Sequence, residues 1–136
     1  MKIIPISAHA GLTGFESPAA QYKQLPLSLD ELLIQHASST FIGIATGQSM
    51  IGCGIHDGDL LIVDRHLDIK NNDVIVCNFN GEFLCKRIDT KRRLLLSENT
   101  NLNPIRIEES DQFSSEGVVT FSIRCHRKNK LTGLIK

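Results

Sequence analysis

The stretch DVIVCNFNGEFLCKRID, residues 73–89, consists of two apolar segments separated by Asn80-Gly81. Asn-Gly between such segments is the strongest local signal for a β-hairpin, because a type I′ turn needs positive φ at both central residues. The flanking segments are rich in Ile, Val, Leu and Phe, the residue types that favour strands. We therefore predict two antiparallel strands, over residues 73–79 and 82–89.

A two-residue turn also fixes which residues of these strands face each other. It places Ile75 opposite Lys86 and, two residues along, Cys77 opposite Leu84. Lys86 then shares a face with Leu84 and Ile88, since alternate residues of a strand point the same way. A lysine among such neighbours is partly desolvated, which lowers its pKa and makes its neutral amine a competent general base. The alternative is that Lys86 lies near a sheet edge and extends its charged end to water; the hairpin leaves both interpretations open.

The rest of the chain is also predicted to be mainly β. Five further short segments are rich in β-branched or large apolar residues and are bounded by turn residues. One short helix is expected over residues 28–36, because Ser28 and Glu31 form an S-x-x-E capping box ahead of apolar residues. The fold class is therefore a compact antiparallel β domain with one short helix. The five additional strands are predicted at residues 41–45, 59–64, 93–97, 105–107 and 117–125.

The beginning of the chain differs from the rest. Residues 1–26 contain glycine and proline but no sustained period of 2 or 3.6, which predicts a flexible N-terminal arm. Residues 27–136 then form the folded domain, and a chain of 136 residues has room for one hydrophobic core. The predicted organisation is an arm followed by a single domain.

Composition excludes several classes of protein. The formal net charge is zero, which argues against general nucleic-acid binding. No segment approaches the ~18 consecutive apolar residues of a membrane span, and the first residues do not resemble a signal peptide. The four cysteines include no C-x-x-C pair, so no metal site is expected. These features predict a cytoplasmic protein with reduced thiols and no contact with a membrane.

One serine lies in a glycine-rich segment ahead of a predicted strand. Ser49 follows Gly47, but Ile51 replaces the second glycine of the G-x-S-x-G pattern of α/β-hydrolases. His56 and Asp57 cannot complete a triad with Ser49, because adjacent residues of an extended segment point apart. From the residues alone, Ser49 is either part of an ordinary turn or a nucleophile whose backbone must approach a substrate closely.

Several motifs in register resemble the LexA/UmuD family of self-cleaving serine peptidases, and most closely its short, UmuD-like members. The resemblance covers roughly residues 14–126. It implies the antiparallel, signal-peptidase-like β domain of that family, here a peptidase and dimerisation domain. The motifs are GFESPAAQY (14–22), LDELLIQHASSTFIGIATGQSM (29–50), GIHDGDLLIVDR (54–65), GEFLCKRI (81–88) and GVV (117–119).

The resemblance also implies roles for individual residues. Ser49 matches the family nucleophile, and Lys86 matches the neutral general base that accepts its proton. The backbone N–H of Ser49, together with that of Gln48, is expected to stabilise the oxyanion. The family needs no metal and no organic cofactor for this chemistry.

The expected substrate is the arm of the protein itself. In register with UmuD-like proteins, the scissile bond lies between Thr13 and Gly14. Family members usually have Ala or Cys before that glycine, so the pair Ala10-Gly11 is the alternative. A glycine after the bond lets the arm bend sharply into a narrow cleft.

The resemblance further implies partners. It predicts a homodimer that cleaves its arm when a RecA–single-stranded DNA filament forms in the SOS response to DNA damage. The trimmed dimer is then expected to join a UmuC-type Y-family polymerase in translesion synthesis. The alternative is a LexA-related transcriptional regulator or anti-repressor. Only 13 residues precede Gly14, too few for a helix-turn-helix, so no direct DNA binding is expected.

Overall fold

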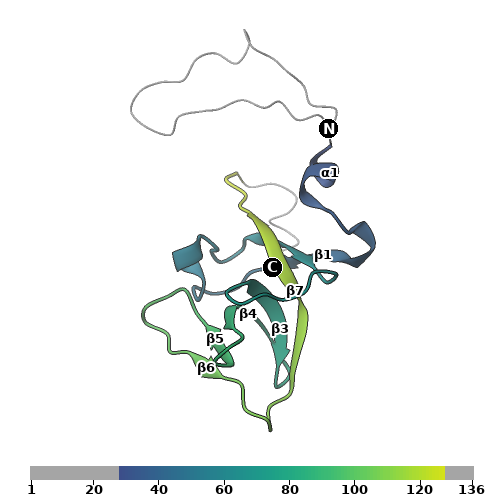
Figure 1. The fold of residues 1–136 in the computed structure, drawn as a ribbon. Coiled ribbons are helices and arrows are strands. Elements are labelled where there is room, and N and C mark those ends of the chain that lie inside the picture. The colour runs from purple at the N-terminus through teal and green to yellow at the C-terminus, as the bar shows by residue number, and fades with distance from the viewer. Residues whose placement is uncertain (1–27, 128–136) are drawn as a thin grey trace. The chain divides into compact units, whose positions relative to one another are not determined.

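The structure, a computed structural model, describes residues 28–127 (Figure 1). The predicted arm over residues 1–26, both candidate cleavage bonds and the predicted domain boundary at residue 27 lie outside the described residues. The chain divides into two compact units, Met1–Gln35 and His36–Lys136. Each unit is described by itself below.

The described part of the first unit contains the predicted helix. α1 spans Leu29–Leu33, and the Ser28 side chain accepts a hydrogen bond of 3.2 Å from the Glu31 backbone N–H. The N-terminal cap is therefore the one that the sequence predicts. The helix is shorter than the predicted 28–36, because Ile34 already has extended backbone angles.

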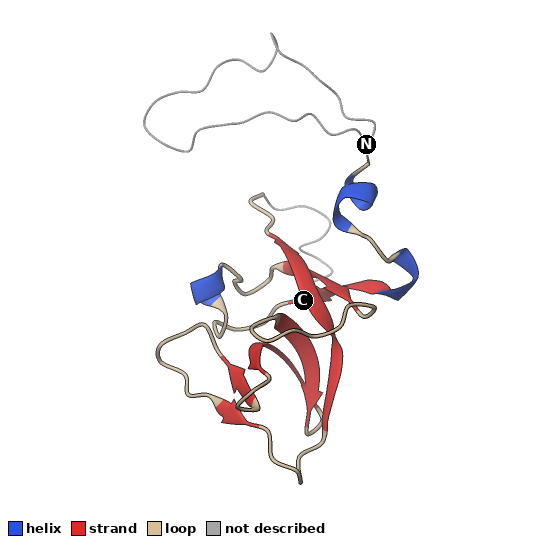
Figure 2. Cartoon of the chain, in the orientation of Figure 1, coloured by secondary structure: helices blue, strands red, loops and turns tan. Residues whose placement is uncertain are grey.

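The second unit is a single seven-stranded sheet in which every neighbouring pair of strands is antiparallel. Strands dominate the unit in Figure 2, which confirms the predicted mainly β class. The strand order is β1-β2-β7-β3-β4-β5-β6, so the last strand of the sequence lies in the middle of the sheet. The strands are β1 Thr40–Ile44, β2 Leu60–Asp64, β3 Val74–Phe79, β4 Glu82–Asp89, β5 Leu94–Leu96, β6 Ile105–Arg106 and β7 Phe113–Ile123; two 3₁₀ turns, η2 Ala37–Ser39 and η3 Ile51–Cys53, complete the elements.

The β3–β4 hairpin has the register that the sequence predicts. Ile75 pairs with Lys86, and the two turn residues Asn80 and Gly81 have φ of 52° and 88°. Positive φ at both positions is the requirement of a type I′ turn. Alternation along β4 places Leu84 and Ile88 on the same face as Lys86. The register adds Ile75 of β3 as the neighbour opposite Lys86.

Two apolar clusters form the core, and they lie against different parts of the curved sheet. One is centred on Ile75 and Leu95, and both of these side chains are completely buried. The other is centred on Leu61 and Val63 and includes Met50, the residue after Ser49. The Ser49 loop is therefore attached to the β2 side of the core through its neighbour in sequence.

Strand β7 begins four residues before its predicted start at residue 117. Its first residues, FSSE, are too polar to be recognised as a strand by composition. Gly117 pairs with Val76 next to a bulge in the ladder with β3, and a Cβ there would come within 2.7 Å of Val63 Cγ1. Only glycine permits this close approach, so the residue that the sequence suggested as a strand start is instead a bend within a longer strand.

Candidate active site

The structure brings the two predicted catalytic residues to the same pocket. Ser49 lies in the loop between β1 and β2, Lys86 lies on β4, and both line a pocket of about 320 Å³. The other lining residues come from β1, β2, β3, β4 and the same loop. Most of them are apolar, which favours exclusion of water from the lysine amine.

Lys86 is a buried lysine. It is only 8% exposed, although it lies one position beyond the last residue pair between β4 and β5, Arg87 with Leu96. Ile75, its cross-strand neighbour, is fully buried. The alternative in which this lysine extends its charged end into water is therefore wrong.

Burial lowers the pKa of the Lys86 amine below its ordinary value. Among residues 28–127, the groups that oppose this effect are the thiols of Cys85 and Cys77, whose negative charge would favour the ammonium form. Burial raises the pKa of Cys85 to about 12 and that of Cys77 to about 11, so both thiols are neutral at neutral pH. Neither thiol therefore offsets the effect of burial at neutral pH, and the neutral amine is more accessible than in a free lysine.

Ser97, the residue directly after β5, contacts the lysine. Lys86 Nζ donates a hydrogen bond of 2.8 Å to Ser97 Oγ. The sequence analysis missed Ser97. The β4–β5 register could have identified this serine. Arg87 pairs with Leu96, so the next position along the ladder places Ser97 opposite Lys86.

The Ser49 loop is held by hydrogen bonds on either side of the serine. Gly47 has φ of 85°, and its N–H donates to the Asp57 carboxylate at 2.7 Å. Ser49 is half-buried, and within residues 28–127 its hydroxyl makes no hydrogen bond. The short 3₁₀ turn η3 follows it directly. The glycine therefore turns the chain, and Asp57 fixes the turn.

The loop is also joined to the segment that follows β5. Asn99 Nδ2 donates to the Gln48 carbonyl at 3.0 Å, and the Gly52 N–H donates to the Glu98 carbonyl at 2.6 Å. The Gln48 carbonyl belongs to the same planar peptide group as the Ser49 N–H, which is the predicted oxyanion donor. The contact of Asn99 therefore fixes the direction in which that N–H points.

Replacing Gly52 by alanine is expected to slow self-cleavage and to lower the free energy of unfolding. A Cβ at this position would lie 2.5 Å from the Glu98 carbonyl oxygen, so the loop must move away from β5. The displacement should cost roughly 1–3 kcal/mol of stability, as overpacking typically does. Chemical denaturation and cleavage rates measure the two effects. Gly43→Ala is the control for stability, because its added Cβ would meet no atom nearer than 3.9 Å, and unchanged values for Gly52→Ala would contradict the close approach.

The segment HDGD, residues 56–59, makes structural contacts. The Asp59 carboxylate accepts from the His56 N–H at 2.8 Å and from Arg124 at 2.9 Å, and the Arg124 hydrogen bond is the main cause of its lowered pKa. Arg124 also donates to the Gly54 carbonyl at 2.7 Å. His56 does not line the pocket of Ser49, in agreement with the rejection of a His56–Asp57 triad.

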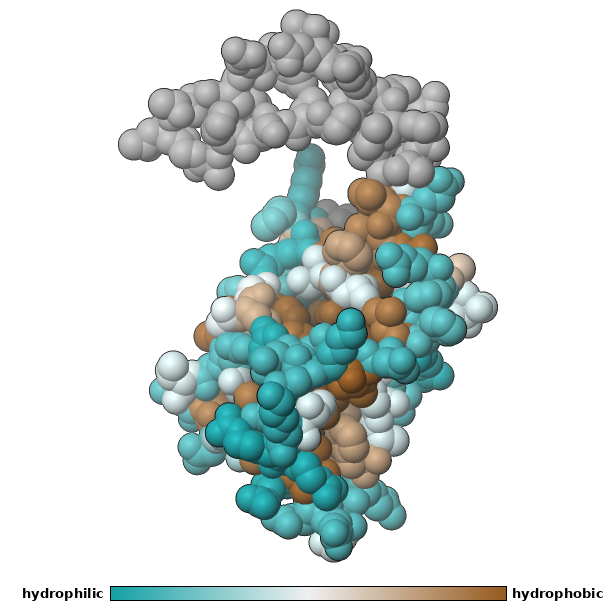
Figure 3. Space-filling view, in the orientation of Figure 1, coloured by the Kyte–Doolittle hydropathy of each residue, from teal (hydrophilic) through white to brown (hydrophobic). Residues whose placement is uncertain are grey.

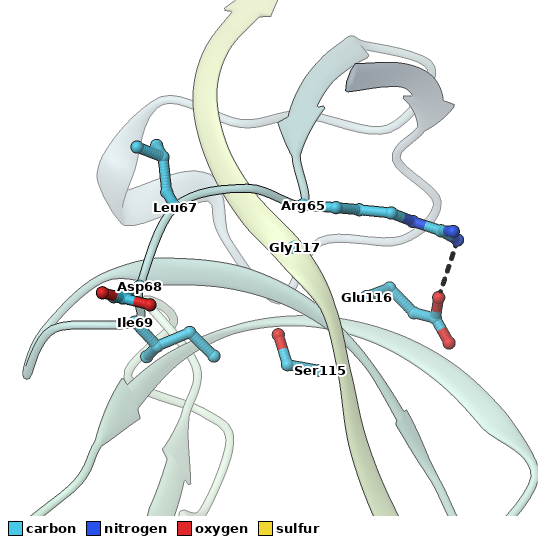
Figure 4. Close-up of a pocket in the computed structure, with 7 residues that line it drawn as sticks. All are labelled: Arg65, Leu67, Asp68, Ile69, Ser115, Glu116 and Gly117. Carbon is cyan, nitrogen blue, oxygen red and sulfur yellow. Dashed lines mark hydrogen bonds and ion pairs between the residues drawn. The ribbon is translucent and has the colours of Figure 1, made fainter. Parts of the chain in front are cut away.

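Another pocket lies where the loop after β2 meets β7 (Figure 4). It is bordered by the ion pair between Arg65 and Glu116, with 2.9 Å between Nη2 and Oε2, and it contains neither Ser49 nor Lys86. Within residues 28–127, no three metal-ligating side chains are grouped closely enough to hold an ion. The helices in this part of the chain are short, and none of them could span a bilayer.

Comparison with known proteins identifies the family. Residues 3–120 match the family described as Peptidase S24-like. The chain is 35% identical to Protein MucA of Salmonella typhimurium over 125 residues, which span 90% of this chain and 86% of that protein. It is 33% identical to Protein ImpA of Salmonella typhimurium over 127 residues, spanning 93% and 86%. It is 32% identical to the LexA repressor of Bordetella avium (strain 197N) over 110 residues, which span 79% of this chain and 51% of the repressor. The chain therefore belongs to the Peptidase S24-like family, and its predicted membership of the LexA/UmuD group of self-cleaving serine peptidases, as a UmuD-like protein, is confirmed.

Proposed function

We propose that the protein is a self-cleaving peptidase of the SOS response that removes its own N-terminal arm and then assists error-prone translesion synthesis. Ser49 is the nucleophile and Lys86 the general base. The observation that carries the proposal is that a serine and a buried lysine with a lowered pKa line one mostly apolar pocket. This pair of groups suffices for acyl transfer without a metal or cofactor.

The proposed reaction conserves every atom and proton. Neutral Lys86 accepts the proton of the Ser49 hydroxyl while Oγ attacks the carbonyl carbon of Thr13. The N–H groups of Ser49 and Gln48 stabilise the oxyanion. Lys86 then gives its proton to the amine of Gly14, which leaves, and an ester joins Thr13 to Ser49. A water molecule hydrolyses this ester, again with Lys86 as the base.

The purified full-length chain is expected to cut itself once, between Thr13 and Gly14. The register of the family resemblance favours this bond over Ala10-Gly11. Intact-mass spectrometry after incubation at mildly alkaline pH distinguishes the two bonds by the fragment masses. A Gly14→Pro chain serves as a control, since it blocks the proposed bond and leaves Ala10-Gly11 intact. A fragment that ends at Ala10 in the unmodified chain would contradict the proposed bond.

The proposed stimulus is a RecA–single-stranded DNA filament, and the proposed later partner is a UmuC-type Y-family polymerase. A filament that favours the cleavable conformation of the arm accelerates cleavage without supplying a catalytic group. Cleavage timed with and without preformed filaments tests this step. Equal rates would remove RecA from the scheme. These partners require a cytoplasmic location, and direct binding of DNA by this chain is not part of the proposal.

A homodimer is part of the proposal, and it is supported by an apolar face of the sheet. Ile42 and Ile44 of β1 and Phe121 and Ile123 of β7 are exposed, and through β2 they share one face of the sheet. Ile42 is 63% exposed. Figure 3 shows apolar side chains among hydrophilic ones on the face that it draws. A group of exposed apolar side chains such as these four favours a protein partner. Sedimentation that shows only monomer across a concentration series would contradict the dimer.

The alternative function is that of a LexA-related transcriptional regulator or anti-repressor. Its support is the similarity to the LexA repressor, of which this chain covers about half the length. Both functions use the same cleavage chemistry, so the cleavage assay does not separate them. Co-purification with a Y-family polymerase subunit after cleavage favours the first function. Specific binding to operator DNA or to a repressor favours the second.

A further inference from the structure

We propose that Ser97 is a positioning residue that orients the Lys86 amine toward Ser49. We further propose that the three-residue segment Ser97–Asn99 holds the proposed nucleophile and base in one arrangement. This inference rests on the proposed function and adds residues to which no catalytic role has so far been given.

The first contact is between Ser97 and the base. Lys86 Nζ donates to Ser97 Oγ at 2.8 Å, and the two residues occupy facing positions at the end of the β4–β5 ladder. A neutral amine has two N–H donors and one lone pair. When Ser97 accepts one N–H, rotation about the last bond of the lysine is restricted and the lone pair is held in one direction. A buried amine without this acceptor would sample several rotamers.

The second contact is between the same segment and the nucleophile loop. Glu98 accepts the Gly52 N–H at 2.6 Å, and Asn99 donates to the Gln48 carbonyl at 3.0 Å. Asn99 is itself fixed, because its side-chain oxygen accepts the Asn101 N–H at 3.0 Å. Successive residues of one short segment thus contact the base strand and both sides of Ser49.

This arrangement has a consequence for rate. Catalysis by a positioned base depends on reacting atoms being about 3 Å apart and aligned, and a displacement of about 1 Å can cost up to 100-fold. The base and the nucleophile come from strands and loops that are far apart in the sequence. Segment 97–99 is bonded to both, so its loss should lower the maximal rate as well as change stability.

The first test compares four full-length variants: Ser97→Ala, Ser97→Thr, Asn99→Ala and the control Ser114→Ala, which removes an exposed hydroxyl of β7. Self-cleavage is followed from pH 7 to about pH 10.5, where the amine of a free lysine titrates. Ser97→Ala should lower the plateau rate at high pH about tenfold or more, and Ser97→Thr should retain it. A plateau for Ser97→Ala within twofold of the unmodified chain overturns the proposal, whether or not its pH midpoint moves.

The second test reads the lysine directly and does not require cleavage. In a full-length Ser49→Ala background, the pH titration of Lys86 is followed by NMR of lysine labelled with ¹³C at Cε, and the signal is assigned by its loss in Lys86→Met. Ser97→Ala should move the midpoint down, because the ammonium form loses a hydrogen-bond acceptor. Cys77 and Cys85, the titratable groups that act on Lys86, are unchanged in all variants. Asn99→Ala and Ser114→Ala should leave the midpoint in place.

Together the two tests distinguish the role of Ser97 from the proposed self-cleavage. If the unmodified chain does not cut itself but Ser97→Ala moves the Lys86 midpoint, the proposed function is wrong and the contact of Ser97 with the amine stands. If Ser97→Ala leaves the Lys86 titration midpoint in place, the role of Ser97 is overturned, whatever the result of the cleavage assay. Thermal unfolding of each variant checks that it is folded, and Ser97→Thr provides the same test with the hydroxyl kept.

Discussion

Replacing Lys86 by methionine is expected to reduce the rate of self-cleavage by at least about 10²–10⁴-fold, the usual contribution of a general base. Methionine keeps the length and apolar stem of lysine, so the packing against Ile75 is preserved. It lacks the amine that we propose as the acceptor of the Ser49 proton. The rate constant for loss of full-length chain, measured at several pH values, gives the effect.

Lys91→Met is the matched control for this substitution. Lys91 is an exposed lysine in the turn between β4 and β5, so the same chemical change is made away from the pocket. Its cleavage rate should equal that of the unmodified chain. If Lys86→Met cleaves as fast as Lys91→Met, the proposed base is wrong and another group must accept the proton.

The lowered pKa of Lys86 predicts how the cleavage rate and the free energy of unfolding change with pH. In the proposed mechanism cleavage needs the neutral amine, so the rate should rise with pH through the lowered pKa and level off below the ordinary lysine value of 10.5. The unfolded chain binds the lysine proton more tightly than the folded chain does. The free energy of unfolding in a Ser49→Ala background should therefore rise with pH between the two pKa values, and Lys86→Met should lose that rise. A rate that still increases above pH 10.5 would contradict the assignment.

The sequence predicts local pairing well and distant pairing poorly. Asn80-Gly81 determines the turn and the register between β3 and β4, because the turn type and the alternation of side chains leave one pairing. The position of β7 between β2 and β3 has no such local signal. That pairing depends on which faces can be buried together, and the bulge at Gly117 adjusts it by one residue. The start of β7 was misplaced for the same reason.

In the candidate site, too, local features are predictable from the sequence and contacts between distant residues are not. The hairpin makes the lysine a candidate, but its burial depends on neighbours outside the hairpin, such as Ser97 after β5, which its amine contacts. Sequence pattern alone could not choose between a shielded amine and one that reaches water. Ser97 and Asn99 were missed because they belong to a polar loop, and their contacts are made with residues 11 and 51 positions away. Polar residues in loops carry no periodic signal that identifies such contacts.

Replacing Ser49 by alanine is expected to abolish self-cleavage, because no other hydroxyl lies between Gly47 and Met50 to form the ester. Removal of a nucleophile typically costs at least about 10³-fold, so the full-length mass should persist under conditions in which the unmodified chain is completely cut. Ser114→Ala, an exposed serine on β7, is the control and should cleave normally. Intact-mass spectrometry over the same time course measures all three proteins.

The stability of the Ser49→Ala chain makes this prediction more specific. Ser49 is half-buried, and within the described residues its hydroxyl makes no hydrogen bond, so the free energy of unfolding should change by less than about 0.5 kcal/mol. A catalytic group that contributes nothing to folding is expected when a site is preorganised for reaction, because the hydroxyl is reserved for the substrate and the base. Loss of cleavage with unchanged denaturation would therefore identify Ser49 as the nucleophile. Cleavage that continues in Ser49→Ala, or disappears only because the chain unfolds, would assign that role elsewhere.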